Sequence, residues 1–204
     1  MHSATLSTDR LRAHFRSARR ALTDAQQADA AGALAQHVVG SPAFHHAQSL
    51  AFYVAADGEL SPECVLRAAL AAGKRCFLPV ANPDELSLRF LSYSGAADAL
   101  VPNRWGLLEP REDSDTAEIE ACNLDLVFLP LVACDAAGTR LGMGKGFYDR
   151  AFAFTLDSAA QASTGPLLVG VAHDCQLSEA PLPRENWDVP LTAIATPSRL
   201  ISPR

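Results

Sequence analysis

Short apolar runs alternate with helical segments along this chain, and that alternation limits its fold more than any other feature. Runs with the length and the aliphatic or aromatic content of strands lie at 49–55, 75–80, 86–91, 124–132, 167–172 and 191–195. Helices are expected between them, one with Ser61 as N-cap, Pro62 at its first position and Gly73 as its stop, and another over 147–156. The alternation predicts an α/β fold: one domain over residues 1–204, with an open, mostly parallel sheet and helices on both faces in a three-layer, Rossmann-like arrangement.

An amphipathic, basic helix is expected before the first strand. Its apolar stripe recurs at helical spacing, at Leu11, Phe15, Ala18 and Leu22. Its other faces are populated by Arg10, Arg12, Arg16, Arg19 and Arg20.

A second helix should follow at once. Thr23, with Gln26 three residues later, is typical of a capping box, so this helix should run over 24–39 and end at the Gly40-Ser41-Pro42 break. Segments 81–85 and 109–120 are polar and rich in turn-forming residues, and we expect both to be loops.

The composition excludes several classes of protein. The 204 residues carry a formal net charge of −6, which argues against a general nucleic-acid binder. The five cysteines form no CxxC pair, so neither a zinc site nor a disulfide framework is indicated, and we expect buried, reduced thiols. No signal-peptide pattern or membrane-spanning run is evident, and we expect a cytoplasmic protein with no membrane partner.

The stretch ACDAAGTRLGMGKGFYDR at 133–150 sets three glycines at alternate positions, after a predicted strand and before a predicted helix. Ligands of open α/β sheets bind at that end of a strand. Gly142, Gly144 and Gly146 allow the backbone to approach an anion and to turn its N–H groups toward it. Arg140 and Lys145 add cationic donors, and the helix that follows adds its positive end.

The loop does not match the familiar phosphate motifs. A P-loop requires Ser or Thr after Gly-Lys, where this chain has Gly146, and a dinucleotide fingerprint requires glycine where it has Phe147. A phosphate cradle and a glycine-rich turn with ordinary solvated cations both remain open on spacing alone.

Other polar clusters give weaker indications. His45-His46 and His173-Asp174-Cys175 lack a second cluster at ligand spacing, so surface or core histidines are favoured over metal ligands. Asp57 and Glu59 follow a predicted strand directly, where acidic turn residues are common. No G-x-S-x-G nucleophile motif is present.

The whole pattern resembles the 5-formyltetrahydrofolate cyclo-ligase family, also called methenyltetrahydrofolate synthetases. The glycine loop with Tyr148-Asp149 is highly specific, and the other blocks are individually weak. The blocks that carry the resemblance follow in the family's order: LRAHFRSARRAL at 11–22, DGELSP at 57–62, AGKRCFLPV at 72–80, NRWGLLEP at 103–110, LPLVACDAAGTRLGMGKGFYDR at 129–150 and WDVPLTAIATP at 187–197.

The resemblance implies an activity and its reactants. Members of this family convert 5-formyltetrahydrofolate into 5,10-methenyltetrahydrofolate with MgATP, releasing ADP and phosphate. It therefore implies Mg²⁺ as cofactor, ATP as co-substrate and small-molecule partners only, and we expect a monomer. A noncatalytic folate- or nucleotide-binding module, or a relative of the sugar-phosphate isomerases on a similar scaffold, are the alternatives.

The resemblance also implies the site residues. Catalytic roles fall to Arg140, Lys145 and Tyr148. The expected ATP contacts are Thr8, Arg12, Arg140, Gly142, Met143, Gly144, Lys145, Gly146, Phe147 and Tyr148. The expected folate contacts are Val54, Glu59, Trp105, Met143, Gly144 and Phe147, and the expected magnesium ligands are Asp149 and Asp188.

The chain departs from the family pattern at three positions. Thr8 stands where a basic residue is usual, one turn before Arg12, so Arg10 or Arg16 would have to substitute for that contact. Cys134 replaces a customary aromatic residue. Phe147 replaces a frequent tyrosine and so lacks its hydroxyl.

Overall fold

The structure is a computed structural model of the 204-residue chain, and it describes residues 7–113, 115–156 and 165–203. Its α-helices are α1 (Thr8–Arg20), α2 (Asp24–Val39), α3 (Pro42–His46), α4 (Glu63–Ala71) and α5 (Phe147–Ala151). Its strands are β1 (Ser49–Ala51), β2 (Arg75–Asn82), β3 (Ser87–Ser92), β4 (Leu100–Pro102), β5 (Leu108–Pro110), β6 (Glu118–Ile119), β7 (Leu126–Pro130), β8 (Ala133–Asp135), β9 (Arg140–Leu141), β10 (Leu167–Val171), β11 (Leu177–Ser178), β12 (Ala193–Ala195) and β13 (Leu200–Ile201). Short 3₁₀ turns lie at Ala97–Ala99, Ala121–Asn123, Ala153–Leu156 and Asp174–Gln176.

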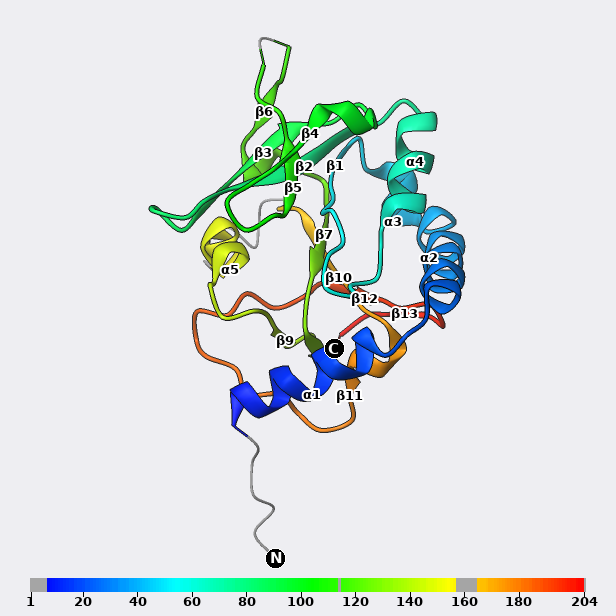
Figure 1. The fold of residues 1–204 in the computed structure, drawn as a ribbon, viewed down its shortest axis with the longest axis vertical. Coiled ribbons are helices and arrows are strands. Elements are labelled where there is room, and N and C mark those ends of the chain that lie inside the picture. The colour runs from blue at the N-terminus through cyan, green and yellow to red at the C-terminus, as the bar shows by residue number, and fades with distance from the viewer. Residues whose placement is uncertain (1–6, 114, 157–164, 204) are drawn as a thin grey trace, which may run out of the picture.

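The central sheet orders its strands β13-β12-β10-β7-β1-β2-β3-β6. The five strands from β12 to β2 run parallel, and β13, β3 and β6 are antiparallel additions at the two edges. The predicted α/β class is thereby confirmed, with a parallel centre and antiparallel edges (Figure 1). A smaller sheet of β11, β8 and β9 extends beyond β7, and it leads to the glycine loop.

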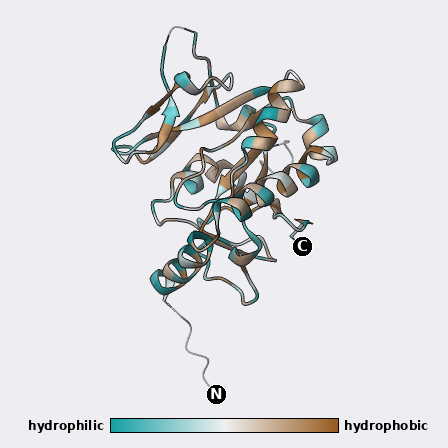
Figure 2. Ribbon diagram, turned by 45° about the vertical axis from the view of Figure 1, so that its right-hand side comes forward, coloured by the Kyte–Doolittle hydropathy of each residue, from teal (hydrophilic) through white to brown (hydrophobic). Residues whose placement is uncertain are grey.

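Alternate side chains of the central strands pack on opposite faces. In β7, Leu126 and Phe128 join the core beneath α2, α3 and α4, whereas Val127 and Leu129 join Phe152, which follows α5. Both faces are therefore covered, as the fully buried apolar strands of a parallel centre require. Figure 2 shows the apolar residues concentrated on these inner strands and the polar residues on the outer sides of the helices.

The helices that the sequence indicates most clearly form as expected. α2 has the predicted bounds, and Thr23 and Gln26 form the capping box in both directions. Gly73 lies in the left-handed region after α4, at φ +71°, where a helix stop is common. Pro62 rather than Ser61 is the N-cap of α4, and the Ser61 hydroxyl accepts a bond from the Glu63 N–H at 3.2 Å.

Several predicted bounds are wrong. The run 49–55 is a strand only over β1, because the chain leaves the sheet after Phe52. The helix predicted over 147–156 ends at Ala151 and continues as a 3₁₀ turn, so its dipole is that of a short helix. The predicted loop 109–120 contains the last residues of β5 and all of β6, because polar edge strands lack an apolar alternation that would mark them.

The cysteines also differ from expectation. Cys76 and Cys134 are buried, but Cys64, Cys122 and Cys175 are exposed, and all five are free thiols. The exposed three lie on the outer side of α4 and in 3₁₀ turns, outside the sheet. Within the described residues, no helix is long and apolar enough to span a bilayer.

Candidate active site

The glycine loop connects β9 to α5. Gly144 and Gly146 adopt left-handed backbone conformations, at φ +87° and +67°, and Gly146 is the N-cap of α5. Such angles strain most other L-residues, so these two positions favour glycine. Gly142 has no atom within 4 Å of the place where a Cβ would stand, and the Met143 side chain is 52% exposed. The loop therefore presents an open backbone surface.

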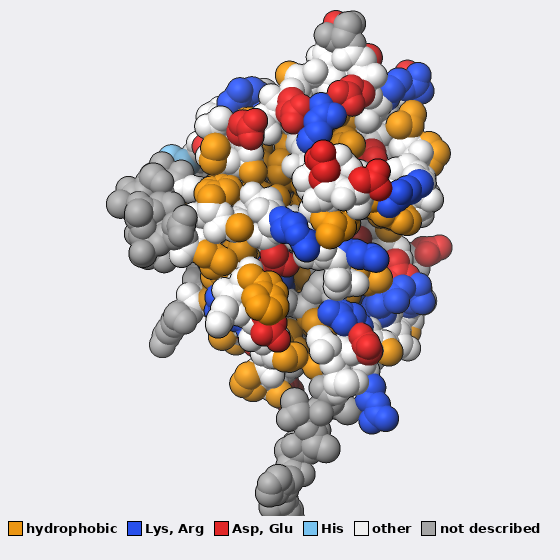
Figure 3. Space-filling model, turned by 90° about the vertical axis from the view of Figure 1, so that its left-hand side faces the viewer, with side chains coloured by type: hydrophobic (Ala, Val, Ile, Leu, Met, Phe, Trp, Pro, Cys, Tyr) orange, Lys and Arg blue, Asp and Glu red, His pale blue; other side chains and the backbone are white. Residues whose placement is uncertain are grey.

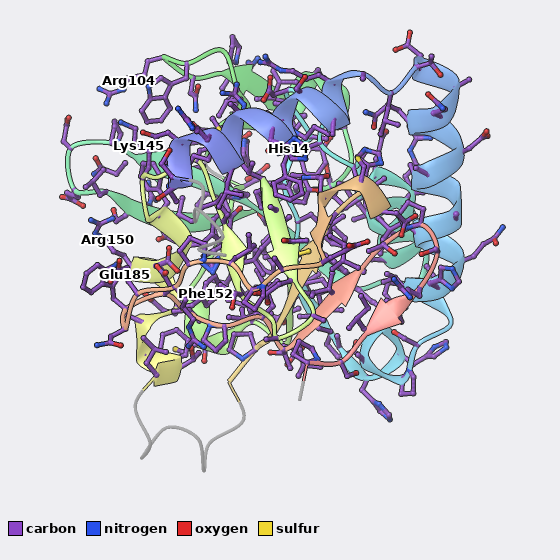
Figure 4. All side chains as sticks on the ribbon, turned by 90° about the horizontal axis from the view of Figure 1, so that it is seen from below. His14, Arg104, Lys145, Arg150, Phe152 and Glu185 are labelled. Atoms are coloured by element: carbon purple, nitrogen blue, oxygen red, sulfur yellow. The ribbon has the colours of Figure 1, made fainter. Side chains whose placement is uncertain are left out.

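Helix α1 lies against this loop. The Arg12 Nε donates to the Gly142 carbonyl at 3.0 Å, and its guanidinium also lies beside Gly144. Figure 4 shows Lys145 beside the first turns of α1, with Arg104 on the same side of the molecule. Arg12, the expected ATP contact on α1, therefore lies against the glycine loop, although Arg12 and Gly142 are 130 positions apart.

The substitutes proposed for the residue at Thr8 lie elsewhere. Thr8 is the first residue of α1 and is half-buried. Arg16 Nε donates to Asp57 at 2.9 Å rather than to the loop, and the Arg10 side chain is exposed. Arg12 is therefore the arginine of α1 that contacts the glycine loop.

Arg140 and Asp149 form an ion pair at the base of the loop. One Arg140 nitrogen donates to Asp149 Oδ1 at 2.6 Å, and another donates to the Val189 carbonyl at 2.8 Å. The Arg140 side chain is only 6% exposed, and burial lowers its pKa while Asp149 and Asp188 oppose that shift. The Arg140 guanidinium thus binds Asp149 and the Val189 carbonyl directly, whereas Asp188 acts on it only through its charge.

Asp149 and Asp188 both lie near Arg140, and theirs are the carboxylates that could hold a metal ion there. Asp149 Oδ1 accepts from Arg140 and from the Val189 N–H, and Asp188 Oδ2 accepts from the Glu185 N–H. Each carboxylate has a second oxygen with no such bond among the described residues. No group of three or more His, Cys, Asp or Glu side chains gathers at a metal-binding distance in the described part of the chain. Two hard oxygens alone suit an ion that completes its shell with phosphate and water, as Mg²⁺ does.

A second polar group faces the loop from the segment after β1. The Glu59 side chain is 16% exposed, and burial raises its pKa against the opposing charge of Arg19. Burial and the nearby Glu59 also raise the pKa of the Tyr148 hydroxyl, so this phenol stays protonated at neutral pH. Glu59 therefore lies near enough to Tyr148 of α5 to influence its hydroxyl electrostatically.

Aromatic side chains border the same region. Trp105, on the turn between β4 and β5, is 46% exposed. Its ring meets the Phe147 ring edge-to-face, with 6.3 Å between the ring centroids. The Arg104 Cζ lies 4.7 Å from the centroid of the Trp105 ring. Val54 is half-buried against the core that underlies α2 and α4. Figure 3 shows this face, with Lys and Arg side chains across its middle and hydrophobic side chains between them. A flat π-system could pack on such a surface.

Two arginines at the site were not predicted. Arg150 Nη1 donates to the Lys145 carbonyl at 2.8 Å and would lie 2.9 Å from a Cβ at Gly146, so it braces the loop. Arg19 is fully buried beneath the turn at 57–59, whereas the sequence analysis placed it on a polar helix face. Its spacing from Arg12 and Arg16 is i, i+4, i+7, a signal that these arginines share one face.

The weaker candidates form no metal-binding cluster within the described residues. His45 and His46 are exposed, and His173 is buried in the core. Asp57 is a turn residue that binds arginines of α1.

Comparison with known proteins shows the family of this chain. The model of the 5-formyltetrahydrofolate cyclo-ligase family matches residues 4–197. The chain is 41% identical over 187 residues to the 5-formyltetrahydrofolate cyclo-ligase of Escherichia coli K12, covering 91% of this chain and 98% of the relative. It is 36% identical over 188 residues to the Haemophilus influenzae protein of the same name, covering 92% and 96%.

A solved structure is similar over nearly the same span. The NMR structure of Aquifex aeolicus 5,10-methenyltetrahydrofolate synthetase superposes with a TM-score of 0.79 at 25% identity, covering 98% of this chain and 94% of that one. With the basic first helix, the glycine loop and Asp188 all inside the matched residues, the chain belongs to the 5-formyltetrahydrofolate cyclo-ligase family.

Proposed function

We propose that this protein converts 5-formyltetrahydrofolate into 5,10-methenyltetrahydrofolate in an ATP- and Mg²⁺-dependent reaction that releases ADP and phosphate. The observation that carries the proposal is that a cationic loop and a partly aromatic, partly acidic surface adjoin each other. A cationic glycine loop with Arg12 precedes Tyr148, which lies near Glu59, and the neighbouring Phe147 meets the exposed Trp105. A phosphate donor and a flat, polar-edged acceptor could bind there together.

The chemistry explains why both reactants are needed. The N5-formyl group is amide-like, so its carbonyl carbon is a poor electrophile and its oxygen a poor leaving group. Transfer of the γ-phosphoryl group to that oxygen breaks the bond to ADP and leaves an iminium-like carbon. N10 then attacks this carbon and loses its proton, the C–O bond breaks, and inorganic phosphate departs with the oxygen. The protein contributes alignment and charge stabilisation.

The residues of the loop divide the work on the nucleotide. The loop amides, Arg12 and Lys145 bind the phosphates, and Arg140 stabilises charge on the transferred group from the base of the loop. Asp149 and Asp188 would hold Mg²⁺, which supplies positive charge between carboxylates and phosphates when bound.

The residues on the other side hold the folate. Glu59 accepts hydrogen bonds from the donor-rich edge of the pterin, and the protonated Tyr148 hydroxyl donates to the reacting region. Trp105 and Phe147 pack on the aromatic rings, with Val54, Met143 and Gly144 completing the contact surface.

An absorbance assay for the methenyl chromophore tests the function. Purified protein with 5-formyltetrahydrofolate should produce the chromophore only when ATP and Mg²⁺ are both present, with one ADP per product. Binding without turnover would instead identify a noncatalytic module. Turnover of a phosphosugar without ATP would identify an isomerase-like relative.

Three further expectations belong to this proposal. A single domain over residues 1–204 is supported by the one central sheet that both cores share. A cytoplasmic location is supported by five free thiols. A monomer is expected, and sedimentation equilibrium of the purified protein checks it.

A further inference from the structure

Arg19 is a charged side chain with no access to solvent, and it joins three parts of the chain. Its side chain is 1% exposed. Nε donates to the Asp57 carbonyl at 2.9 Å, Nη1 donates to the Leu131 carbonyl at 3.0 Å, and Nη2 donates to Asp57 Oδ2 at 2.9 Å. A buried guanidinium is retained only where such partners satisfy it.

The turn at 57–59 is clamped onto α1 by this residue and its neighbours. Asp57 accepts from Arg16, Arg19 and Arg20, and its own φ of +54° is unusual for a residue other than glycine. Gly58 passes so close to α1 that a Cβ would lie 3.1 Å from the Arg19 carbonyl oxygen. Burial opposes ionisation of Asp57, but its hydrogen bonds to these arginines outweigh it and lower the pKa to about 2.

The contacts between the arginines of α1 and the turn extend to Glu59, for which Arg19 is the nearest cation. Arg19 Nη2 lies 3.5 Å from Glu59 Oε1, and the Ala56 N–H donates to Oε2 at 3.1 Å. The other ionisable groups that face Glu59 are Arg16 of α1, Asp57 of the same turn, Tyr53 after β1 and Tyr148 of α5. Among these, only the arginines favour the carboxylate, and Arg19 is the one in contact.

We propose that Arg19 is a positioning residue for the folate: it fixes the turn at 57–59 and keeps Glu59 charged beside the glycine loop. This inference rests on the proposed function, because Glu59 is its assumed folate contact. The role of Arg19 is to act through Glu59 rather than to touch the substrate.

The physical requirement is that a buried carboxylate remain an anion. Burial raises the pKa of Glu59, and Arg19 is the largest influence that lowers it. Removing the Arg19 charge should therefore raise the pKa further, so that part of the Glu59 population is protonated near neutral pH. A protonated carboxyl offers a weaker acceptor to the pterin, and raising the pH should restore it.

The test measures folate binding directly, by calorimetry of 5-formyltetrahydrofolate with the full chain in the absence of ATP. Arg19→Met should weaken binding about tenfold at neutral pH, and the loss should shrink as the pH rises toward about 9. The folate affinity of the wild-type protein should not change over the same pH range. Glu59→Gln should bind folate weakly at every pH. The double variant with Arg19→Met should show no pH dependence of folate binding.

Arg20→Met is the matched control, since Arg20 also pairs with Asp57 but is 55% exposed and has no described contact with Glu59. It should bind folate like wild type at every pH. An equal loss at all pH values in Arg19→Met, or the same loss in Arg20→Met, would overturn the proposal in favour of a purely structural role.

Arg19→Lys keeps the comparison decisive if Arg19→Met does not fold. A lysine retains the positive charge but lacks the planar guanidinium with its several donors. Folate affinity should therefore stay within a few-fold of wild type and should not change with pH. A large, pH-independent loss in a folded Arg19→Lys protein would contradict the proposal. Failure of wild type itself to bind 5-formyltetrahydrofolate would count against the proposed function rather than against the link between Arg19 and Glu59.

Discussion

The glycine loop and the turn at 57–59 border the same site but are built in opposite ways. The loop takes most of its shape from nearby residues, because Gly144 and Gly146 supply left-handed angles within a few positions of Lys145 and Asp149, with Arg12 of α1 as an added contact. The turn takes its shape from a distant helix, because arginines some 40 positions earlier hold Asp57 in place. Local substitutions should therefore damage the loop, whereas the turn should depend on buried charge.

Asp149→Asn should produce the largest effect on the loop side. Asn keeps the oxygen that accepts from Arg140 and Val189 but removes the charge that a magnesium ion needs. We expect turnover to fall by about 10²-fold or more, with partial recovery at high Mg²⁺. Steady-state kinetics across a magnesium series, with melting curves as control, measure this. Normal turnover at low Mg²⁺, or loss through unfolding alone, would make Asp149 a structural acid.

Arg140→Ala should lower turnover more than Lys145→Ala does. Arg140 is buried and paired with Asp149, whereas Lys145 is exposed beside backbone amides that share its task. We expect losses of about 10²-fold and about tenfold, respectively. Arg140→Ala should also lower the melting temperature, because it leaves Asp149 without its cation. Equal losses in turnover would show that the two cations are ranked wrongly.

Glu59→Gln probes the other side of the comparison. It should raise the Michaelis constant for 5-formyltetrahydrofolate about tenfold and leave that for ATP within about twofold, because a neutral amide is a weaker acceptor for the pterin. Separate titrations of the two substrates decide this. A selective rise for ATP would move Glu59 to the nucleotide side of the site.

Gly146→Ala should have the smallest effect, and Gly142→Ala is its matched control. At Gly146 a methyl group meets a φ of +67° and the Arg150 guanidinium, and the left-handed angle costs about 1–2 kcal/mol. Gly142 offers open space and no left-handed angle. We expect a few-fold rise in the ATP Michaelis constant for Gly146→Ala alone. Equal effects in both variants would show that the backbone angle at 146 does not shape the site.

Much of the fold follows from local signals. The capping box at Thr23 set the start of α2, Gly73 marked the stop after α4, and the apolar runs located the central strands. Strands β6, β11 and β13 were not predicted, because each has two residues and so shows no hydrophobic periodicity. The short β9 was missed for the same reason, although it is the element that leads to the glycine loop.

The candidate site also has features that the local sequence predicts and features that it does not. The chemical types in the glycine loop, and the proximity of Arg140, Lys145 and Asp149 to one another, were already evident in one contiguous stretch. The burial of Arg19 was not, because a helix with arginines on several faces does not reveal which face another segment will cover.

The sequence by itself determined the α/β alternation, the second helix and the composition of the glycine loop, since each depends on residues a few positions apart. Only the tertiary structure decided that Arg12 lies on Gly142, that Arg140 pairs with Asp149 against Val189, and that Arg19 lies between Asp57 and Glu59. The physical reason is that an ion pair or a buried hydrogen bond joins groups by their distance in space. That distance is set by how the helices and the sheet pack, which no local pattern encodes.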